Sequence, residues 1–186
     1  MKRFLDLIIS IILLFLLFFP SLIICFFIIL DSKGNVFFTT LRIGKNKKIF
    51  KMYKFRTMDI NTPIINSNDL EEPKKYITKF GKILRRYSID EIPQIINIIL
   101  GDMSLVGPRP ALNNQQDLIK KRDFHKIFSI KPGLTGLAQI NGRDNLSLDE
   151  KVNYDNHYKL NQSTFLDIKI MIQTILVVLK SKDVRH

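Results

Sequence analysis

An apolar run near the N-terminus, from Phe4 to Leu30, constrains this chain more than any other feature. Its only charged residue is Asp6, and it is longer than the roughly 20 residues that a helix needs to span a bilayer. The segment therefore belongs in lipid. A secretory signal peptide has a shorter apolar core followed by small residues at a cleavage site, whereas this run continues into Asp31 and Lys33, so cleavage is not expected.

Two features of the segment favour a turn inside one leaflet over a straight span. Pro20, preceded by Phe19, lies past the middle of the run, where a proline removes a backbone hydrogen bond and kinks a helix. Basic residues flank both ends, beginning with Lys2 and Arg3 before the run. Since basic flanks tend to stay in the cytoplasm, we predict a re-entrant helix–break–helix over residues 1–31, with the break at Phe19-Pro20. An ordinary signal anchor with a proline kink is the alternative.

Beyond this segment, residues 32–186 have the length of one ordinary domain. The chain has 29 lysines and arginines against 17 aspartates and glutamates, a net charge of +12 that predicts an anionic partner: nucleic acid, an anionic leaflet or phosphorylated small molecules. Cys25 is the single cysteine, so no intrachain disulfide forms. His125 and His157 lie far apart without other ligands at metal-binding spacing, so no zinc site is expected.

The domain is predicted to be α+β and mainly α. Val36–Thr40 and Lys48–Thr57 are rich in β-branched and aromatic residues and flank Gly44–Lys47, which predicts a short β-hairpin with most of its basic residues on a solvated face. The polar stretch Asp59–Asp69 predicts a loop.

Four helices are predicted after this loop. Pro73 starts an amphipathic helix with a basic face, which is either packed or interfacial, and a second helix ends before Gly101. A third covers Leu146–Lys159. The last covers about Thr164–Lys180 and carries an apolar stripe, which predicts a packed or interfacial helix rather than a spanning one.

The adjacent carboxylates Asp90 and Glu91 are the strongest candidates for chemistry. If the apolar run Ile92–Leu100 is helical, Pro93 must lie in or near its first turn because it has no N–H, which starts the helix near Ser88. A helix N-terminus keeps a carboxylate ionised and attracts phosphate, two properties that a nucleophile attacking a phosphoryl group needs. The alternative is structural, because Ser88-x-x-Glu91 is also the pattern of a capping box.

Two segments rich in glycine and proline each carry an arginine. In the first, Pro108 and Pro110 bracket Arg109, and a rigidly placed fork-shaped cation suits a bidentate grip on phosphate. The second, Lys131–Arg143, is neither a P-loop nor a Rossmann fingerprint, but its glycines permit close approach of a ligand to the backbone. Ordinary turns are the alternative in both cases.

Taken together, these motifs strongly resemble the bacterial sugar transferase family, the small monotopic polyprenyl-phosphate phosphoglycosyl transferases. The likeness covers nearly the whole chain, in the same order and spacing. The motifs that carry it are Lys54–Met58, Ser88–Gln94, Gly101–Pro110, Lys131–Gly136 and Asn141–Arg143.

The resemblance implies an enzyme that takes a UDP-sugar and requires Mg²⁺. An aspartate attacks the β-phosphate, releases UMP and carries the phosphosugar, which undecaprenyl phosphate collects in the second step of a ping-pong cycle. By motif, Asp90 is the nucleophile and Glu91 its partner, and this pair is the candidate Mg²⁺ site. The residues expected to bind phosphate or nucleotide are Arg109, Arg143, Arg85 and Gln139.

The same resemblance implies a domain on the cytoplasmic face of the bacterial inner membrane, in contact with membrane lipids. The chain departs from the family at the break, where relatives have serine before the proline and this chain has Phe19. A non-catalytic, membrane-anchored basic protein that binds acidic lipid or nucleic acid is the alternative. The sequence has no interleaved aromatic–basic platform and no recognisable nucleic-acid motif, so nucleic acid is not an expected partner.

Overall fold

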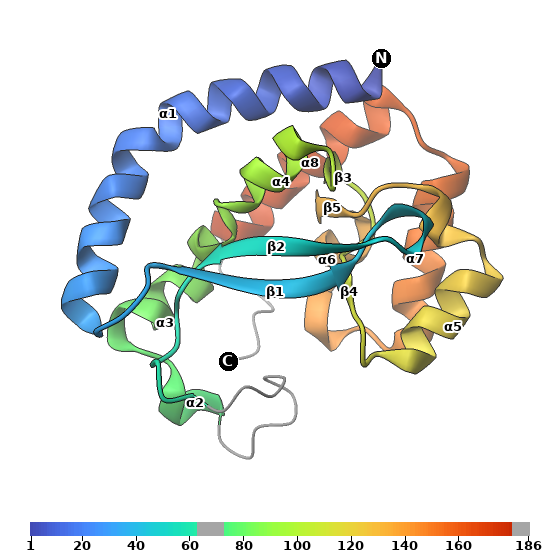
Figure 1. Cartoon of the computed structure of the whole chain (residues 1–186). Helices are drawn as coiled ribbons and strands as arrows, with labels where there is room; N and C mark the ends of the chain where they lie inside the picture. Colours follow the sequence, from blue (N-terminus) through green and yellow to red (C-terminus); the bar gives the residue numbers. More distant parts are fainter. Residues whose placement is uncertain (63–72, 180–186) are drawn as a thin grey trace.

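The computed structural model describes residues 1–62 and 73–179. It is a mostly helical α+β fold with a long apolar N-terminal helix and small sheets (Figure 1), which confirms the predicted class. The α-helices are α1 (Lys2–Asp31), α2 (Pro73–Tyr76), α3 (Lys79–Arg86), α4 (Gln94–Leu100), α5 (Gln116–Phe124), α6 (Leu137–Ile140), α7 (Leu148–Leu160) and α8 (Thr164–Leu179). The strands are β1 (Phe37–Ile43), β2 (Ile49–Phe55), β3 (Ser104–Val106), β4 (Ala111–Leu112) and β5 (Gly133–Thr135). Short 3₁₀ turns are η1 (Lys45–Lys47), η2 (Ile89–Glu91), η3 (Ile127–Ser129) and η4 (Arg143–Asn145).

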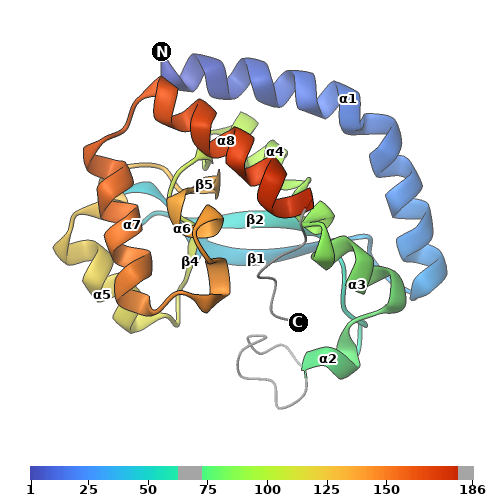
Figure 2. The same ribbon diagram turned by 180° about the vertical axis from the view of Figure 1, so that it is seen from behind.

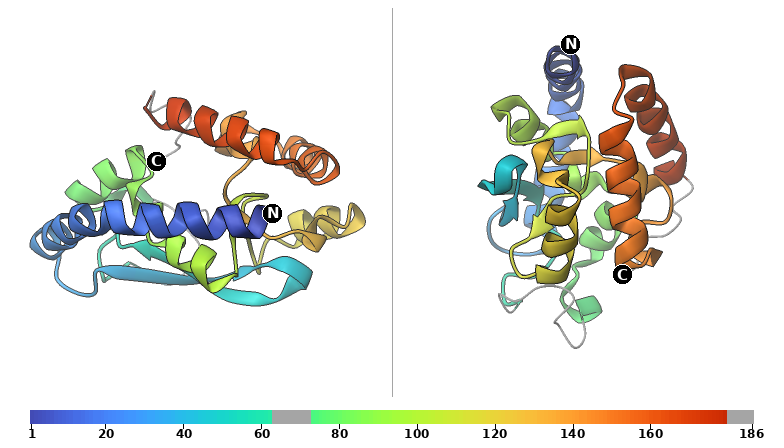
Figure 3. Two further views of the ribbon diagram at one scale, coloured as in Figure 1. Left: turned by 90° about the horizontal axis from the view of Figure 1, so that it is seen from above. Right: turned by 90° about the vertical axis from the view of Figure 1, so that its right-hand side faces the viewer.

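The elements are stacked in layers. Seen from above, β1 and β2 lie on one side and α8 on the other, with α1 and α4 between them (Figure 3). From behind, α8 crosses the molecule with α7 beside it (Figure 2). The main core is built from β2, α4, β3, α7 and α8, and its buried residues are Phe50, Met52, Ile98, Met103, Leu105, Val106, Tyr158 and Ile170.

The predicted hairpin is confirmed as β1 paired antiparallel with β2. β1 continues past Thr40 to Ile43, pairing with β2 along its whole length and with β4 at its end. The prediction that most of the basic residues are solvated is confirmed, since Lys47, Lys48 and Lys51 are exposed, and two residues are the exceptions. Arg56 is buried and donates to the carbonyls of Ser32 and Lys33, and the Lys54 ammonium is turned toward carboxylates.

One side chain of α4 forms hydrogen bonds with the free edge of β2, in addition to the apolar packing of the two elements. Asn97 is fully buried, and its amide oxygen accepts from Tyr53 N at 3.0 Å while its amide nitrogen donates to Lys51 O at 2.7 Å. The carboxamide thus continues the hydrogen-bond ladder that the edge strand would otherwise leave open. This contact holds the N-terminal end of α4 beside Lys54.

The glycines of the two loops rich in glycine and proline lie against one another. β3 and β5 pair in parallel, with Gly107 N donating to Thr135 O at 2.8 Å and Gly133 N to Pro108 O at 2.9 Å. A Cβ on Gly133 would lie 2.0 Å from Gly107 N, and one on Gly136 would lie 2.2 Å from Gly107 O. These glycines therefore admit backbone against backbone, and not the ligand approach that was predicted for the second loop.

The single helix predicted from Pro73 is divided into α2 and α3. The interruption arises because Ile77 pairs with Met58 in an isolated bridge and Thr78 Oγ1 caps α3 by accepting from Gly81 N at 3.0 Å. A side-chain cap of this kind starts a new helix where periodicity alone predicts continuity.

The later helices agree with prediction in position. α7 begins at Leu148 because Ser147 and Glu150 form a capping box, slightly inside the predicted Leu146–Lys159. The rest of the predicted Asp59–Asp69 loop, from residue 63 onward, and Lys180 at the predicted end of α8 lie outside the described residues. The apolar stripe of α8 faces away from the core, where Asp167 and Ile170 are buried instead. The large apolar side chains that α8 exposes are Phe165, Ile168, Ile172, Ile175, Leu176 and Leu179.

The N-terminal end of α1 is bound to the domain by charged side chains. Lys2 Nζ lies 2.7 Å from Asp167 Oδ2, and Arg3 donates to carbonyls at the end of α4. Asp6, the only charge in the apolar run, is 4 % exposed and accepts from Ser104 Oγ at 2.8 Å. The carboxylate therefore has a docking role, which explains its presence in an otherwise apolar segment.

The C-terminal end of α1 is bound to the same domain. Asp31 Oδ2 accepts from Phe80 N at 2.8 Å, and Arg56 caps the carbonyls that follow the helix. Ile28 is buried in a second core with β2 and with Leu84 of α3. Both ends of the apolar helix therefore contact one compact domain.

Between its ends, α1 is a continuous helix through Phe19 and Pro20, where a break was predicted. It changes direction along its length (Figure 1), because a proline removes one hydrogen bond and bends a helix without ending it. Among the described residues it is the one helix long and apolar enough to cross a membrane, and 6 % of its apolar window is buried. That exposure supports membrane association over a role as a soluble core helix.

α5 is joined to α7 by a buried ion pair. Arg122 and Asp155 are 4 % and 2 % exposed, and Arg122 Nε and Nη2 lie 2.9 and 2.6 Å from Asp155 Oδ2. Burial raises the pKa of Asp155, and Arg122 opposes that rise. The remaining guanidinium nitrogen, Arg122 Nη1, donates to Arg109 O at 2.7 Å.

Gly133→Ala is expected to lower the free energy of unfolding by about 3 kcal/mol, because the new methyl group meets backbone that cannot move without separating β3 from β5. Gly101→Ala is the matched control. Gly101 has φ +96°, but its Cβ would meet only the ends of the Arg3 and Lys131 side chains, so the cost there is about 1 kcal/mol. Thermal unfolding followed by circular dichroism in detergent should rank the two; equal melting temperatures would contradict the backbone contact.

Arg122→Met is expected to destabilise the chain by about 3–5 kcal/mol, because it leaves the Asp155 carboxylate buried without a cation. Replacing both residues, as Arg122→Met with Asp155→Leu, should recover much of this loss since no buried charge is left. The same thermal measurement checks the pair, and a double variant no more stable than the single one would refute the explanation.

Candidate functional site

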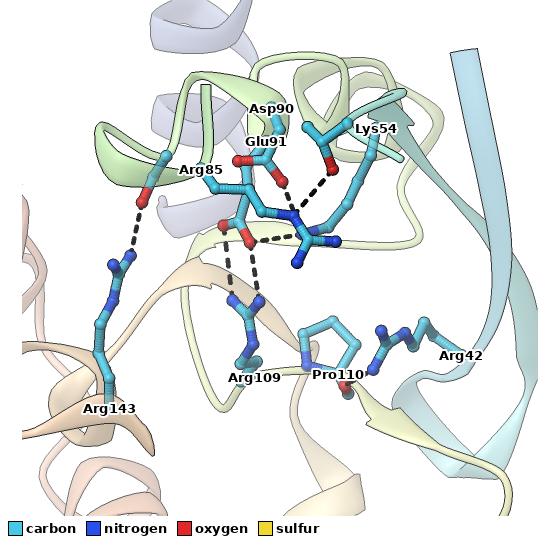
Figure 4. A network of polar contacts seen from close by, with 10 residues as sticks. Arg42, Lys54, Arg85, Asp90, Glu91, Arg109, Pro110 and Arg143 are labelled. Atoms are coloured by element: carbon cyan, nitrogen blue, oxygen red, sulfur yellow. Dashed lines mark hydrogen bonds and ion pairs between the residues drawn. The ribbon is translucent and has the colours of Figure 1, made fainter. Parts of the chain in front are cut away.

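Asp90 and Glu91 lie in η2 between β2 and the loop after β3, surrounded by cations (Figure 4). Each carboxylate residue is 8 % exposed. Lys54 Nζ lies 3.2 Å from Asp90 Oδ2 and 2.7 Å from Glu91 Oε1, so one ammonium bridges the pair. The Arg109 guanidinium donates two hydrogen bonds to the Glu91 carboxylate, from Nη2 to Oε1 at 2.8 Å and from Nη1 to Oε2 at 3.4 Å.

The two carboxylates differ in how well their charge is satisfied. Burial raises the pKa of Glu91, but Arg109 and Lys54 outweigh burial and hold this pKa well below its usual range. For Asp90, burial dominates and the neighbouring Glu91 adds to it, so its pKa is raised despite the opposing Lys54. Glu91 therefore anchors the cations, while Asp90 is the carboxylate that gains most from further positive charge.

The turn that presents the pair begins at Ser88, which is left-handed at φ 54°, and leads through Pro93 into α4. A helical turn thus starts next to Ser88, as predicted, but it is the separate 3₁₀ turn η2, and α4 itself starts at Gln94 with Pro93 at its N-cap. The capping-box alternative is wrong. Ser88 Oγ accepts from Arg143 Nη2 at 3.0 Å, and the Glu91 carboxylate faces cations, which bind it more strongly than a backbone N–H would.

The remaining predicted residues divide into two groups. Arg85 Nε donates to Thr57 Oγ1 at 2.9 Å; burial lowers the Arg85 pKa and nearby Asp90 opposes this, so Arg85 lies beside the pair. Arg143 reaches the turn through Ser88. Gln139 is buried, and within the described residues neither its amide oxygen nor its amide nitrogen has a hydrogen-bond partner. In the described ranges, Gln139 therefore makes no hydrogen bond to the carboxylate pair.

Lys54 is the site residue that sequence reasoning missed. It lies on a strand among several lysines, a pattern typical of a solvated face, and its partners are 36 and 37 positions away in the chain. The one available signal was its place in the Lys54–Met58 motif. Arg122 was also missed; its contact with Arg109 O braces the loop that carries the Arg109 guanidinium.

The donor atoms of the carboxylate pair are compatible with a magnesium ion that is also bound by a phosphorylated ligand. Among the described residues no group of three or more His, Cys, Asp or Glu side chains is placed to hold a metal. Magnesium is commonly bound by one or two carboxylates plus substrate phosphates, and retains several waters. Asp90 and Glu91 match that donor set, and a closed protein cage is not required.

Comparison with known proteins places these features in a family. The sequence profile described as bacterial sugar transferase matches residues 1–181. The uncharacterized sugar transferase EpsL of Bacillus subtilis is 40 % identical over 100 % of this chain and 91 % of its own length.

Two longer relatives have more specific names. The undecaprenyl-phosphate galactose phosphotransferase of Salmonella typhimurium is 33 % identical over 97 % of this chain, and the UDP-glucose:undecaprenyl-phosphate glucose-1-phosphate transferase of Klebsiella pneumoniae is 37 % identical over 94 %. This chain spans 40 % and 39 % of their respective lengths. With a profile match over nearly its whole length and a full-length relative at 40 % identity, the chain belongs to the bacterial sugar transferase family.

Proposed function

We propose that this chain transfers a phosphosugar from a UDP-sugar to undecaprenyl phosphate and releases UMP. Relatives named as undecaprenyl-phosphate sugar phosphotransferases support the general reaction. The observation that carries the proposal is the carboxylate pair buried against Lys54, Arg85 and Arg109. An anionic nucleophile approaches a diphosphate only where fixed cations offset the repulsion, and this site supplies them.

The proposed reaction has two displacements at one phosphorus atom. An Asp90 oxygen attacks the β-phosphorus of the UDP-sugar, the bond to the bridging oxygen breaks, and UMP leaves with that oxygen. The product on the protein is an aspartyl-phosphosugar. An oxygen of undecaprenyl phosphate then attacks the same phosphorus and frees the Asp90 carboxylate. The lipid product is an undecaprenyl diphosphate sugar.

The neighbouring residues have separate tasks in this scheme. Lys54 favours the ionised form of Asp90, which burial disfavours. Arg109 spans from buried Glu91 to solvent, with its side chain 43 % exposed against 10 % for Glu91, so it meets phosphate at the entrance. Asp90 and Glu91 are the residues that would hold Mg²⁺, which when bound would neutralise phosphate charge. Arg143 stabilises the turn through Ser88.

The two-ended attachment of α1 supports a re-entrant course with both ends on the cytoplasmic face of the inner membrane. A helix of this length extends about 45 Å, more than the roughly 30 Å of the hydrocarbon core. A straight crossing would put its ends on opposite sides, so either Lys2 would lose Asp167 or Asp31 would lose Phe80. The exposed apolar stripe of α8 would then lie in the membrane interface.

Asp90→Asn is expected to reduce UMP release by roughly a thousandfold or more, because the nucleophilic oxygen is lost. In this assay, the full parent chain and the full variant chain are each incubated with Mg²⁺, undecaprenyl phosphate and a panel of UDP-sugars, and the released UMP is measured. With UDP-sugar alone, intact-protein mass spectrometry should detect the phosphosugar adduct on the parent chain and not on this variant. Asp123→Asn, an exposed carboxylate far from the pair, is the control. Full activity of Asp90→Asn, or no turnover with any UDP-sugar, would refute the proposal.

Topology can be tested in intact cells with Cys25→Ala as background. A cysteine inserted between Met1 and Lys2 and one replacing Lys33 should both resist a membrane-impermeant maleimide and react only after the inner membrane is opened. Reaction of either position from the periplasm would establish a spanning helix instead.

A further inference from the structure

Arg42 is a cation beside the site with no assigned role. It lies near the end of β1, opposite Leu112 of β4, and its Nη1 donates to Pro110 O at 3.3 Å. Figure 4 shows its guanidinium next to Pro110, on the loop that carries Arg109. β4 thus pairs with β1 at the position that holds Arg42 against this loop.

The surroundings of Arg42 leave its charge and one N–H unsatisfied. Nε is buried, and within the described residues it has no acceptor. Burial, together with the like charge of Arg109, lowers the pKa of Arg42 to about 10, and Glu91 only partly opposes this. A buried donor without an acceptor and two adjacent guanidiniums are each unfavourable, and a bound anion would relieve both at once.

The carboxylates present do not meet this need. Glu91 is engaged by Lys54 and Arg109, and Asp90 by Lys54. In the described part of the chain Arg42 has no carboxylate within ion-pair distance. Support of the Pro110 carbonyl needs only one neutral donor, so it does not explain why a second guanidinium, with its Nε buried, lies beside Arg109.

We propose that Arg42 and Arg109 together bind the diphosphate of the nucleotide substrate, one guanidinium for each phosphate. This rests on the proposed function for the identity of the nucleotide. The geometry of the fork supplies the specificity, because a planar guanidinium can donate two parallel hydrogen bonds to one phosphate. The pair should therefore favour ligands with two adjacent phosphates over ligands with one.

The test is binding of UDP, UMP and inorganic diphosphate to the full chain in detergent, by calorimetry at constant ionic strength and Mg²⁺. Arg42→Gln should weaken UDP and inorganic diphosphate roughly tenfold or more, and UMP less than about threefold. Lys51→Gln is the matched control, since it removes the same charge from an exposed position on β2, the strand that pairs with β1, and should leave all three affinities unchanged.

Arg42→Lys separates binding from support of the loop. A lysine can still donate to Pro110 O, so a purely structural role predicts that it restores both melting temperature and affinity. The proposal expects restored melting temperature with UDP affinity still several-fold weak, because one ammonium cannot form the fork. Equal losses for UDP and UMP, unchanged UDP affinity in Arg42→Gln, or full rescue by Arg42→Lys would each overturn it.

Inorganic diphosphate binding does not depend on uridine or turnover. If Arg42→Gln loses diphosphate binding, the role of Arg42 stands even if no UDP-sugar is a substrate. If the parent chain releases UMP but Arg42→Gln binds diphosphate normally, only the role of Arg42 is refuted, and the proposed function stands.

Discussion

The ion pairs of Glu91 hold the site together. A carboxylate at this depth is stable only with cations close by, and the two that satisfy it come from β2 and from the loop after β3. Because Glu91 fixes Lys54 and Arg109, the adjacent Asp90 is presented within reach of the same ammonium while its own charge is less fully met. One residue thus acts as the electrostatic anchor, and its neighbour is left available for chemistry.

The supports behind this cluster are buried and polar. Asn97 attaches α4 to the edge of β2, and the Arg122–Asp155 pair braces the carbonyl of Arg109. Buried groups of this kind are directional, so they hold a loop at one place more tightly than apolar packing would. The glycine contacts between β3 and β5 have the same effect, because the close backbone–backbone approach leaves no room for one strand to shift relative to the other.

The apolar N-terminal helix is part of this construction and not a separate tether. Ile28 shares a core with Phe55 and Leu84, and Ile89 and Ile92, which flank the carboxylate pair, pack against the same cluster. At the opposite end, Asp6 and Lys2 enter polar contacts with the domain. The membrane segment therefore packs against the same core as the turn that carries Asp90 and Glu91. This arrangement suits an enzyme whose proposed acceptor has its phosphate at the surface of the bilayer.

Several features followed from the sequence alone because their causes are local. The length of the apolar run predicted the membrane helix, and the hairpin residues around Gly44 predicted the pairing of β1 with β2. Pro93 predicted a helix over the following apolar residues, although α4 starts at Gln94 and not near Ser88. Asp90, Glu91 and Arg109 were identified through their motifs, and the structure brings them together. The division of α2 from α3 was missed, since a bridge to Met58 overrides helical periodicity.

Other features depend on contacts between distant residues, and only the tertiary structure decided them. Lys54 is a surface lysine by pattern and becomes a site residue only when α4 is placed against β2. Ser88 belongs to a capping box by spacing, yet binds Arg143 once the loops meet. Sequence thus determined which residues are the candidates for the chemistry. Charge partners at long range, which no local pattern encodes, decided how each of them is held.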